Sequence, residues 1–307
     1  CEAHAVDPSR IMTFTSGWAG SEDKEEDSKA HMLPFDTTLY RKGWHDNHRA
    51  GGPETWVENY YKGPKDNIMY TGNRTEVFLR GEEGAISTPP RIQLINDEVE
   101  RTGKTGWDGL FWKSQYKAFT DYFQKKGLAS HFGTLDDLTR SMANVSFEHQ
   151  GRRIEGMRMQ NLGDAYMVNG WEAMPYDNHS GIVDIYRNPK GDASILAYYN
   201  QPLYVAVASR NQVVKLPGSA IVDFYIVNEK NLKGNHILEI KVIAPDGKVV
   251  YTRNETVSIE GGETFGQLLL ENVEVPVNGK EGTYRILADI KADNQQICAQ
   301  GHDEVVA

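Results

Sequence analysis

The pattern of hydrophobic and polar positions divides the chain near residue 200. Beyond that point, short apolar or alternating segments follow one another closely, with turn signals such as Pro245-Asp246-Gly247 between them. The expected strands cover 203–208, 219–228, 236–243, 248–252, 267–275 and 283–290. About seven short strands in about 105 residues is the spacing of an immunoglobulin-like β-sandwich. The sequence therefore predicts this all-β fold for residues 201–307.

Residues 1–200 mix strand-like and helix-like patterns. Short strands are expected at 11–16, 32–40, 76–81 and 165–172. Between the last two, helices are expected after Pro89-Pro90 (with Ile92, Ile95 and Val99 on one face), over the apolar stripe 116–123, and from Thr134 as N-cap. Such alternation favours a parallel sheet with helical crossovers, the α/β class. About four strand–helix units fit here, whereas a closed (β/α)8 barrel needs eight.

Composition narrows the range of partners. The chain has 307 residues and is 39% hydrophobic, which suffices for a sizeable core. Its 33 Lys and Arg against 43 Asp and Glu give a net charge of −10, which argues against nucleic acid or an anionic membrane as the main partner. No run of 18 apolar residues occurs, so no membrane span is expected, and residues 1–10 lack the apolar core of a signal peptide.

Several classes of site have no signature in the sequence. Cys1 and Cys298 make neither a disulfide framework nor a zinc site, and Cys1 is either a lipidated first residue or simply where this sequence begins. A P-loop, a GxGxxG fingerprint, a GxSxG elbow and an HExxH helix are all missing. Most nucleotide-binding, serine-hydrolase and zincin functions are thereby excluded, and we expect neither a cofactor nor a metal.

A pair of carboxylates stands out after the strand expected at 76–81. Glu82 and Glu83 follow Arg80-Gly81 and precede Gly84. In parallel α/β folds the carboxyl ends of strands carry the chemistry. Because adjacent strand residues point to opposite faces, only one of the two glutamates can face a barrel interior. The alternative is a pair of solvated glutamates in a turn.

Two further segments have the composition of a sugar site. The segment 44–49 holds His45, Asp46 and His48 beside Trp44, as in a loop that binds a polar substrate. A metal site there lacks a third ligand at suitable spacing, and a plain surface loop is the other alternative. At 169–172, an indole can stack on a pyranose while amide and carboxylate groups bind hydroxyls. The residues concerned are Asn169, Trp171 and Glu172; Trp171 could instead be a core residue, and Trp18 is equally ambiguous.

The order of these segments resembles glycoside hydrolase family 2 of clan A, the β-galactosidases, β-mannosidases and β-glucuronidases. Asp7-Pro8-Ser9-Arg10 resembles the step before barrel strand five, 44–53 the His- and Gly-rich loop after strand six, and 81–87 the strand-seven motif SEFGxQS. Residues 163–171 and 184–190 resemble strand eight and the signature D-Y-x-x-x-P-K. The resemblance implies strands five to eight of a TIM barrel in residues 1–200 and the family's immunoglobulin-like domain in 201–307.

The resemblance also implies a mechanism. The resemblance implies a retaining enzyme with Glu82 as nucleophile. Glu83 stands where the family has Phe or Tyr, so the choice between Glu82 and Glu83 as nucleophile stays open. Trp171 would form the floor of the subsite that holds the cleaved sugar. The hydroxyls of that sugar would be bound by His45, Asp46 and His48. The acid/base, an Asn-Glu pair at strand four, is expected upstream of this chain, because Asn228-Glu229 lies in the sandwich. The partners would then be a carbohydrate and the N-terminal part of the same enzyme.

Two other functions compete with this one. The chain could be a non-catalytic carbohydrate-binding or structural module with a degenerate barrel. A metal-dependent hydrolase built on His45, His48 and a carboxylate is the weakest alternative. By resemblance to polysaccharide-degrading relatives, we expect a periplasmic or secreted bacterial protein. The sequence leaves open the sugar, the linkage, exo or endo action and the oligomeric state.

Overall fold

The computed structural model describes residues 6–7, 44–51, 61–64, 77–103, 106–161, 165–168, 170–172 and 181–307, with the backbone alone for 44–51, 77–86 and Trp107. These residues fall into two compact units. The first unit comprises residues 1–58, 72–154 and 164–200, and the second comprises 59–71, 155–163 and 201–307. The strands expected at 11–16 and 32–40, and the candidate site residues Trp18 and Asn169, lie outside the described residues.

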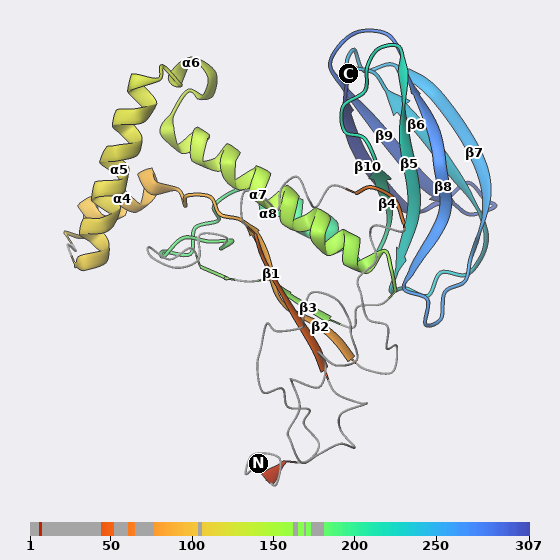
Figure 1. The fold of residues 1–307 in the computed structure, drawn as a ribbon, viewed down its shortest axis with the longest axis horizontal. Helices are drawn as coiled ribbons and strands as arrows, with labels where there is room; N and C mark the ends of the chain where they lie inside the picture. Colours follow the sequence, from red (N-terminus) through yellow and green to blue (C-terminus); the bar gives the residue numbers. More distant parts are fainter. Residues whose placement is uncertain are drawn as a thin grey trace. The chain divides into compact units, whose positions relative to one another are not determined.

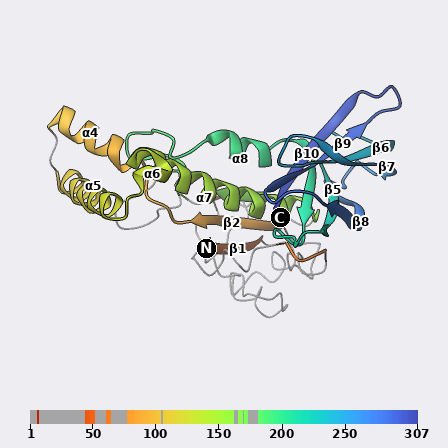
Figure 2. The ribbon, with the colours of Figure 1, turned by 90° about the horizontal axis from the view of Figure 1, so that it is seen from above.

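The described strands of the first unit form a parallel sheet. Strands β1 (Trp44–Gly51), β2 (Val77–Ile86) and β3 (Ala165–Val168) are ordered β1-β2-β3, and both pairings are parallel. Figures 1 and 2 show β1 and β2 side by side. The parallel sheet agrees with the expectation from strand–helix alternation.

Three local predictions about these strands were wrong. Residues 44–51 were expected to form a loop, but they form β1, because their backbone pairs with β2 even though the sequence WHDNHRAG has no strand-like pattern. The strand expected to end at Gly81 continues to Ile86, so Glu82 and Glu83 lie within β2 and not in a turn after it. Conversely, β3 ends at Val168, before Trp171.

Helices occupy the chain between β2 and β3. They are α4 (Ile92–Thr102), α5 (Trp107–Lys125), α6 (Ala129–Phe132) and α7 (Leu135–Arg158), and α8 (Ala193–Tyr199) follows β3. The predicted stripe of α4 is buried together with Trp112 of α5, and Figures 1 and 2 show these two helices side by side. The predicted cap at Thr134 is confirmed: its Oγ1 accepts from Asp137 N (3.0 Å), and Asp137 Oδ2 accepts from Thr134 N (3.2 Å).

The described residues of the second unit form seven strands in two antiparallel sheets. Their bounds are β4 (Leu203–Ser209), β5 (Gly218–Asn228), β6 (Gly234–Ile243), β7 (Val249–Ile259), β8 (Gly266–Val277), β9 (Thr283–Lys291) and β10 (Ile297–Val306). One sheet has the order β4-β5-β8 and the other β10-β9-β6-β7. Alternate residues of both sheets share one hydrophobic core, for example Phe224, Ile240 and Ile286. The arrangement is compatible with the expected β-sandwich.

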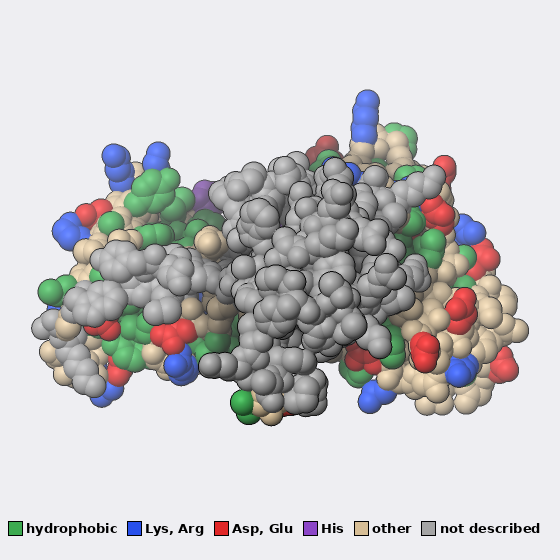
Figure 3. All heavy atoms as spheres, turned by 60° about the horizontal axis from the view of Figure 1, so that its bottom comes forward, with side chains coloured by type: hydrophobic (Ala, Val, Ile, Leu, Met, Phe, Trp, Pro, Cys, Tyr) green, Lys and Arg blue, Asp and Glu red, His purple; other side chains and the backbone are tan. Residues whose placement is uncertain are grey.

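The described part of the chain shows mixed surface charge. Among the described residues on the face drawn in Figure 3, acidic and basic side chains are intermingled. Within the described residues, none of the helices has both the length and the apolar character needed to cross a bilayer.

Candidate functional site

The pairing of β1 with β2 places the candidate residues beside one another. The register sets His48 opposite Glu82 and Arg49 opposite Glu83. Glu83 is also opposite Val168 of β3. Residues opposite each other on neighbouring strands lie on the same face of a sheet. The backbone therefore puts His48 and Glu82 on one face, next to each other.

Strand β2 contains an extra residue directly before the two glutamates. From the pair Asp46–Leu79 to the pair His48–Glu82, β1 advances by two residues and β2 by three. Opposite β3 the same shift occurs between Arg80 and Glu83. Both neighbours thus locate a bulge-type irregularity in β2 at Arg80–Glu82. Bulges of this kind are common next to active sites, where they redirect one residue to the other face.

The irregularity decides which glutamate shares a face with His48. In a regular β2, the positions on the face of Leu79 would be 81 and 83, because alternation has a period of two. The extra residue moves Glu82 onto that face instead, opposite His48, and leaves Glu83 opposite Arg49. Within β1, Asp46 and His48 are two residues apart and share a face, whereas His45 lies on the other.

Trp171 follows the end of β3 and is exposed. Its side chain has a relative exposure of 60%, so it is no part of a described core. Its backbone is nevertheless held, because its carbonyl oxygen accepts hydrogen bonds from Ile182 N and Val183 N, both at 3.1 Å. Gly170 before it has φ +73°, a conformation that favours glycine. An exposed indole on a fixed backbone is a suitable platform for a sugar ring.

A tight turn at 184–188 supports this platform. The carboxylate of Asp184, fully buried, accepts hydrogen bonds from Tyr186 N (2.8 Å), Asn188 N (2.9 Å) and Asn188 Nδ2 (3.0 Å). Arg187 has φ +70° in this turn and forms an ion pair with Glu172. Glu172, expected to bind substrate, is therefore already engaged by a cation that sequence analysis did not single out.

Buried Lys190 connects the turn to the end of β2. Its Nζ donates a hydrogen bond to the carbonyl oxygen of Thr88 at 2.9 Å, and its backbone N donates to Ile182 O at 2.9 Å. Burial lowers the pKa of Lys190 to about 7. The residues of the D-Y-x-x-x-P-K signature thus join the segment after β3 to the segment after β2. The signature itself was visible in the sequence, but its anchoring role depends on contacts with residues far along the chain.

Metal-binding groups are not found among the side chains that the structure describes. In that set, no three His, Cys, Asp or Glu residues gather around one point. The side chains of His45, Asp46 and His48 lie outside it.

Among the comparisons with known proteins, only the one with solved structures found similar chains. No protein-family model matches the chain, and no curated protein sequence matches it. The β-D-mannosidase of Dictyoglomus thermophilum is similar with a TM-score of 0.50 and 14% identity, over 85% of this chain and 30% of that one. An exo-chitosanase of Amycolatopsis orientalis gives a TM-score of 0.40 and 16% identity, over 57% of this chain and 20% of that one. A β-glucuronidase of Bacteroides uniformis gives a TM-score of 0.25 and 14% identity, over 34% of this chain and 13% of that one.

A glycosyl hydrolase family 2 member of Bacteroides cellulosilyticus gives a TM-score of 0.25 and 15% identity, over 34% of this chain and 15% of that one. The chain spans less than a third of the length of each of these proteins. The likeness to the β-D-mannosidase, which extends over most of this chain, is a likeness of fold.

Proposed function

We propose that residues 1–200 are the strand-five-to-eight half of the (β/α)8 barrel of a retaining β-glycosidase, and that Glu82 is its nucleophile. The observation that carries the proposal is the register of β1 and β2. It sets Glu82, and not Glu83, on the face of Asp46 and His48. The fold likeness to a β-D-mannosidase supports the same conclusion. Residues 201–307 would be the immunoglobulin-like domain that follows the barrel.

The proposed reaction is a double displacement. The Glu82 carboxylate attacks the anomeric carbon, and the glycosidic bond breaks while an acid protonates the departing oxygen. Water then attacks the glycosyl-enzyme ester, the acid group takes a proton from that water, and Glu82 is released as carboxylate. The acid/base glutamate is expected from a part of the enzyme upstream of this chain. Two carboxylates about 5–5.5 Å apart are needed for this course.

The neighbouring residues would bind the substrate. Asp46 and His48 share the face of Glu82 and would bind sugar hydroxyls. Trp171 would stack on the apolar face of the sugar. Its fixed backbone would keep the indole in place without induced ordering. Glu172 would contribute to substrate binding through its ion pair with Arg187.

Trapping with a 2-fluoro aryl glycoside tests the nucleophile. We expect the label on Glu82 of the polypeptide that carries both barrel halves, identified by peptide mass spectrometry. Glu82→Gln should lower kcat by at least about 10³-fold, whereas the matched Glu83→Gln should retain most activity. Label on Glu83, with the effects of the two substitutions exchanged, would refute the assignment of the nucleophile.

A binding module without catalysis is the second candidate. The exposed Trp171 favours it, because a stacking platform serves binding as well as hydrolysis. Titration of this chain with neutral β-glycosides, followed by calorimetry, tests binding alone. Trp171→Ala should weaken binding about tenfold without changing the melting temperature, because the side chain is exposed. Binding together with no turnover by any polypeptide that contains this chain would favour the module.

A further inference from the structure

A fully buried carboxylate lies in the middle of β5, on the face away from the shared core. Asp223 has no exposed surface. Its neighbours Val222 and Phe224 point into the core between the two sheets, so Asp223 and Tyr225 belong to the other face of the β4-β5-β8 sheet. Burying a charge costs free energy unless hydrogen bonds compensate for the lost water. The hydrogen-bond partners of Asp223 therefore determine how far the cost of its burial is compensated.

Two of these partners belong to the sheet and the turn beside it. Arg210 donates from Nε and Nη2 to the two carboxylate oxygens, both at 3.0 Å, and Nη2 also reaches Glu271 at 3.3 Å. Asn272 N donates to Asp223 Oδ1 at 2.7 Å. Asn272 has φ +57° at a register shift between β5 and β8, which turns its N–H out of the ladder and toward the carboxylate.

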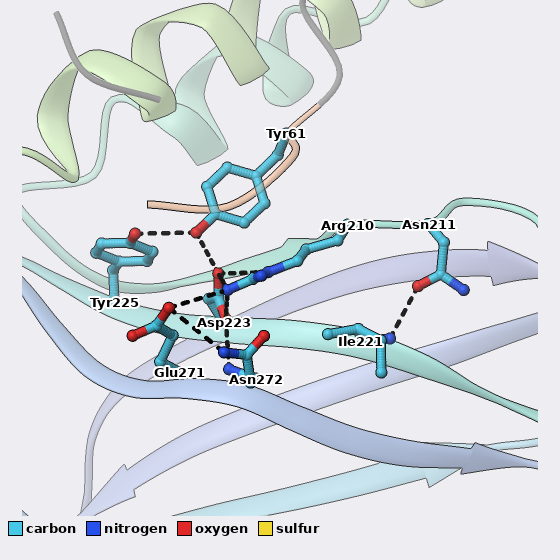
Figure 4. A network of polar contacts seen from close by, with 8 residues as sticks. All are labelled: Tyr61, Arg210, Asn211, Ile221, Asp223, Tyr225, Glu271 and Asn272. Carbon is cyan, nitrogen blue, oxygen red and sulfur yellow. Dashed lines mark hydrogen bonds and ion pairs between the residues drawn. The ribbon is translucent and has the colours of Figure 1, made fainter. Parts of the chain in front are cut away.

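The remaining partner comes from far along the chain (Figure 4). The hydroxyl of Tyr61 donates a hydrogen bond to Asp223 Oδ2 and lies 2.9 Å from the hydroxyl of Tyr225. The rings of the two tyrosines meet edge to face, with centroids 6.2 Å apart. Tyr61 thus supplies both a hydrogen bond and a packing contact.

Gly63 completes the fit. It is buried and has φ +134°. A Cβ built there would lie 3.1 Å from both Cζ and Nη1 of Arg210, so the guanidinium of Arg210 lies directly against the backbone of Gly63. Two residues of one short segment therefore contact the same Asp223–Arg210 pair.

We propose that the outer face of the β4-β5-β8 sheet is a docking surface for residues 61–64 of the same chain, and that Tyr61, Asp223 and Arg210 form the clasp that holds them. Residues 59–71 lie between β1 and β2 in the sequence and group with the second unit. The clasp does not depend on the proposed enzymatic activity.

Limited trypsin cleavage after Lys62 tests the clasp in the full chain. Lys62 is exposed and adjacent to Tyr61, so its cleavage reports release of the segment. Tyr61→Phe should raise the cleavage rate about tenfold or more, and amide exchange of the 59–71 peptide should rise with it. Asp223→Asn should have the same effect.

Tyr284→Phe is the matched control. The hydroxyl of Tyr284, in the same unit, donates to the carbonyl oxygens of Lys280 (2.8 Å) and Asn278 (3.1 Å). Loss of this hydroxyl should weaken the unit without raising the rate of cleavage after Lys62 at native temperature. Equal cleavage in Tyr61→Phe and unchanged protein, or equal cleavage in Tyr61→Phe and Tyr284→Phe, would overturn the proposal. Because Tyr61→Phe removes a single oxygen atom and keeps the ring, we expect the variant to fold.

Discussion

At the scale of the residue, both units bury charged side chains. Asp184 and Asp223 have no exposed surface, yet each accepts at least three hydrogen bonds. Lys190 is equally buried, and its charged form is disfavoured by desolvation. These side chains are costly to bury, and each orders the backbone around it: Asp184 fixes its own turn, whereas Lys190 and Asp223 hold segments that are distant in sequence.

Lys190 should make stability depend on pH between neutral and alkaline conditions. Its pKa is about 7 in the folded protein and 10.5 ordinarily, so within this window the unfolded chain binds more protons. The free energy of unfolding should rise with pH from 7 to 10, by up to about 1.4 kcal/mol per pH unit. Lys190→Met should remove this slope in urea denaturation measured at several pH values. Parallel curves for the two proteins would contradict the assignment.

Tyr61 should act in the opposite sense at higher pH. Burial and the hydrogen bond to Asp223 raise the pKa of Tyr61, and burial raises the pKa of Tyr225 to about 12. The folded protein then keeps protons that the unfolded chain loses above pH 10, so stability is present below pH 10 and falls above it. Arg210, Asp223 and Glu271 are the charged groups around the two hydroxyls. Tyr61→Phe should make the alkaline loss of stability shallower, as measured by denaturation between pH 9 and 11.

At the scale of the element, close approach between helices depends on one small residue. Gly151 of α7 lies against the ring of Tyr199 in α8: a Cβ on Gly151 would be 1.9 Å from Tyr199 Cδ2. The hydroxyl of Tyr199 is fixed by a hydrogen bond to Glu148 at 2.5 Å, so the ring has little freedom to move away. The contact seats α8 on the middle of α7.

Gly151→Ala should therefore destabilise the first unit by about 1–3 kcal/mol. The direction of this stability change is informative, because alanine at an unobstructed helix position stabilises a protein by roughly 0.5–1 kcal/mol relative to glycine. Urea denaturation checks the prediction. In the double variant with Tyr199→Leu the two effects should be less than additive, and additivity would indicate that the two residues do not contact each other.

Elements with a local signal were predictable from the sequence. The stripe of Ile92, Ile95 and Val99 and the cap at Thr134 depend on neighbours within one or two turns, and α4 and α7 begin as expected. Strand β1 was missed because its sequence is polar and its backbone is fixed by pairing with β2. Of the candidate site, Glu82 and His48 were both named from the sequence, but the extra residue in β2 that sets them opposite each other is defined only by the pairing of all three strands.

At the scale of the whole molecule, the two units do not divide the chain at a single point. The second unit takes in 155–163 as well as 201–307. Arg158 donates to Gln201 O (2.7 Å) and Glu229 (2.6 Å) and lies over the ring of Tyr204, and Asn161 Oδ1 accepts from Phe265 N at 2.7 Å. Such contacts between distant segments leave no trace in local sequence patterns.

The second unit should accordingly be more stable as residues 155–307 than as residues 201–307. The longer fragment retains the contacts of Arg158 and Asn161, and we expect its melting temperature to be higher by at least about 5 °C. Calorimetry of the two fragments checks this. Arg158→Ala in the longer fragment should remove much of the difference; equal melting temperatures would show that 155–163 adds nothing.

The extra residue in β2 has an evolutionary consequence. With two acidic residues in succession, the face of β2 that carries Leu79 has an acidic position whether or not the strand keeps its irregularity: Glu82 with it, opposite His48, and Glu83 without it, further along the strand. Loss of the irregularity would therefore change which acid lies on this face and would still leave an acid there. A lineage with this tandem could tolerate a slip in strand register that would abolish a site built on a single glutamate.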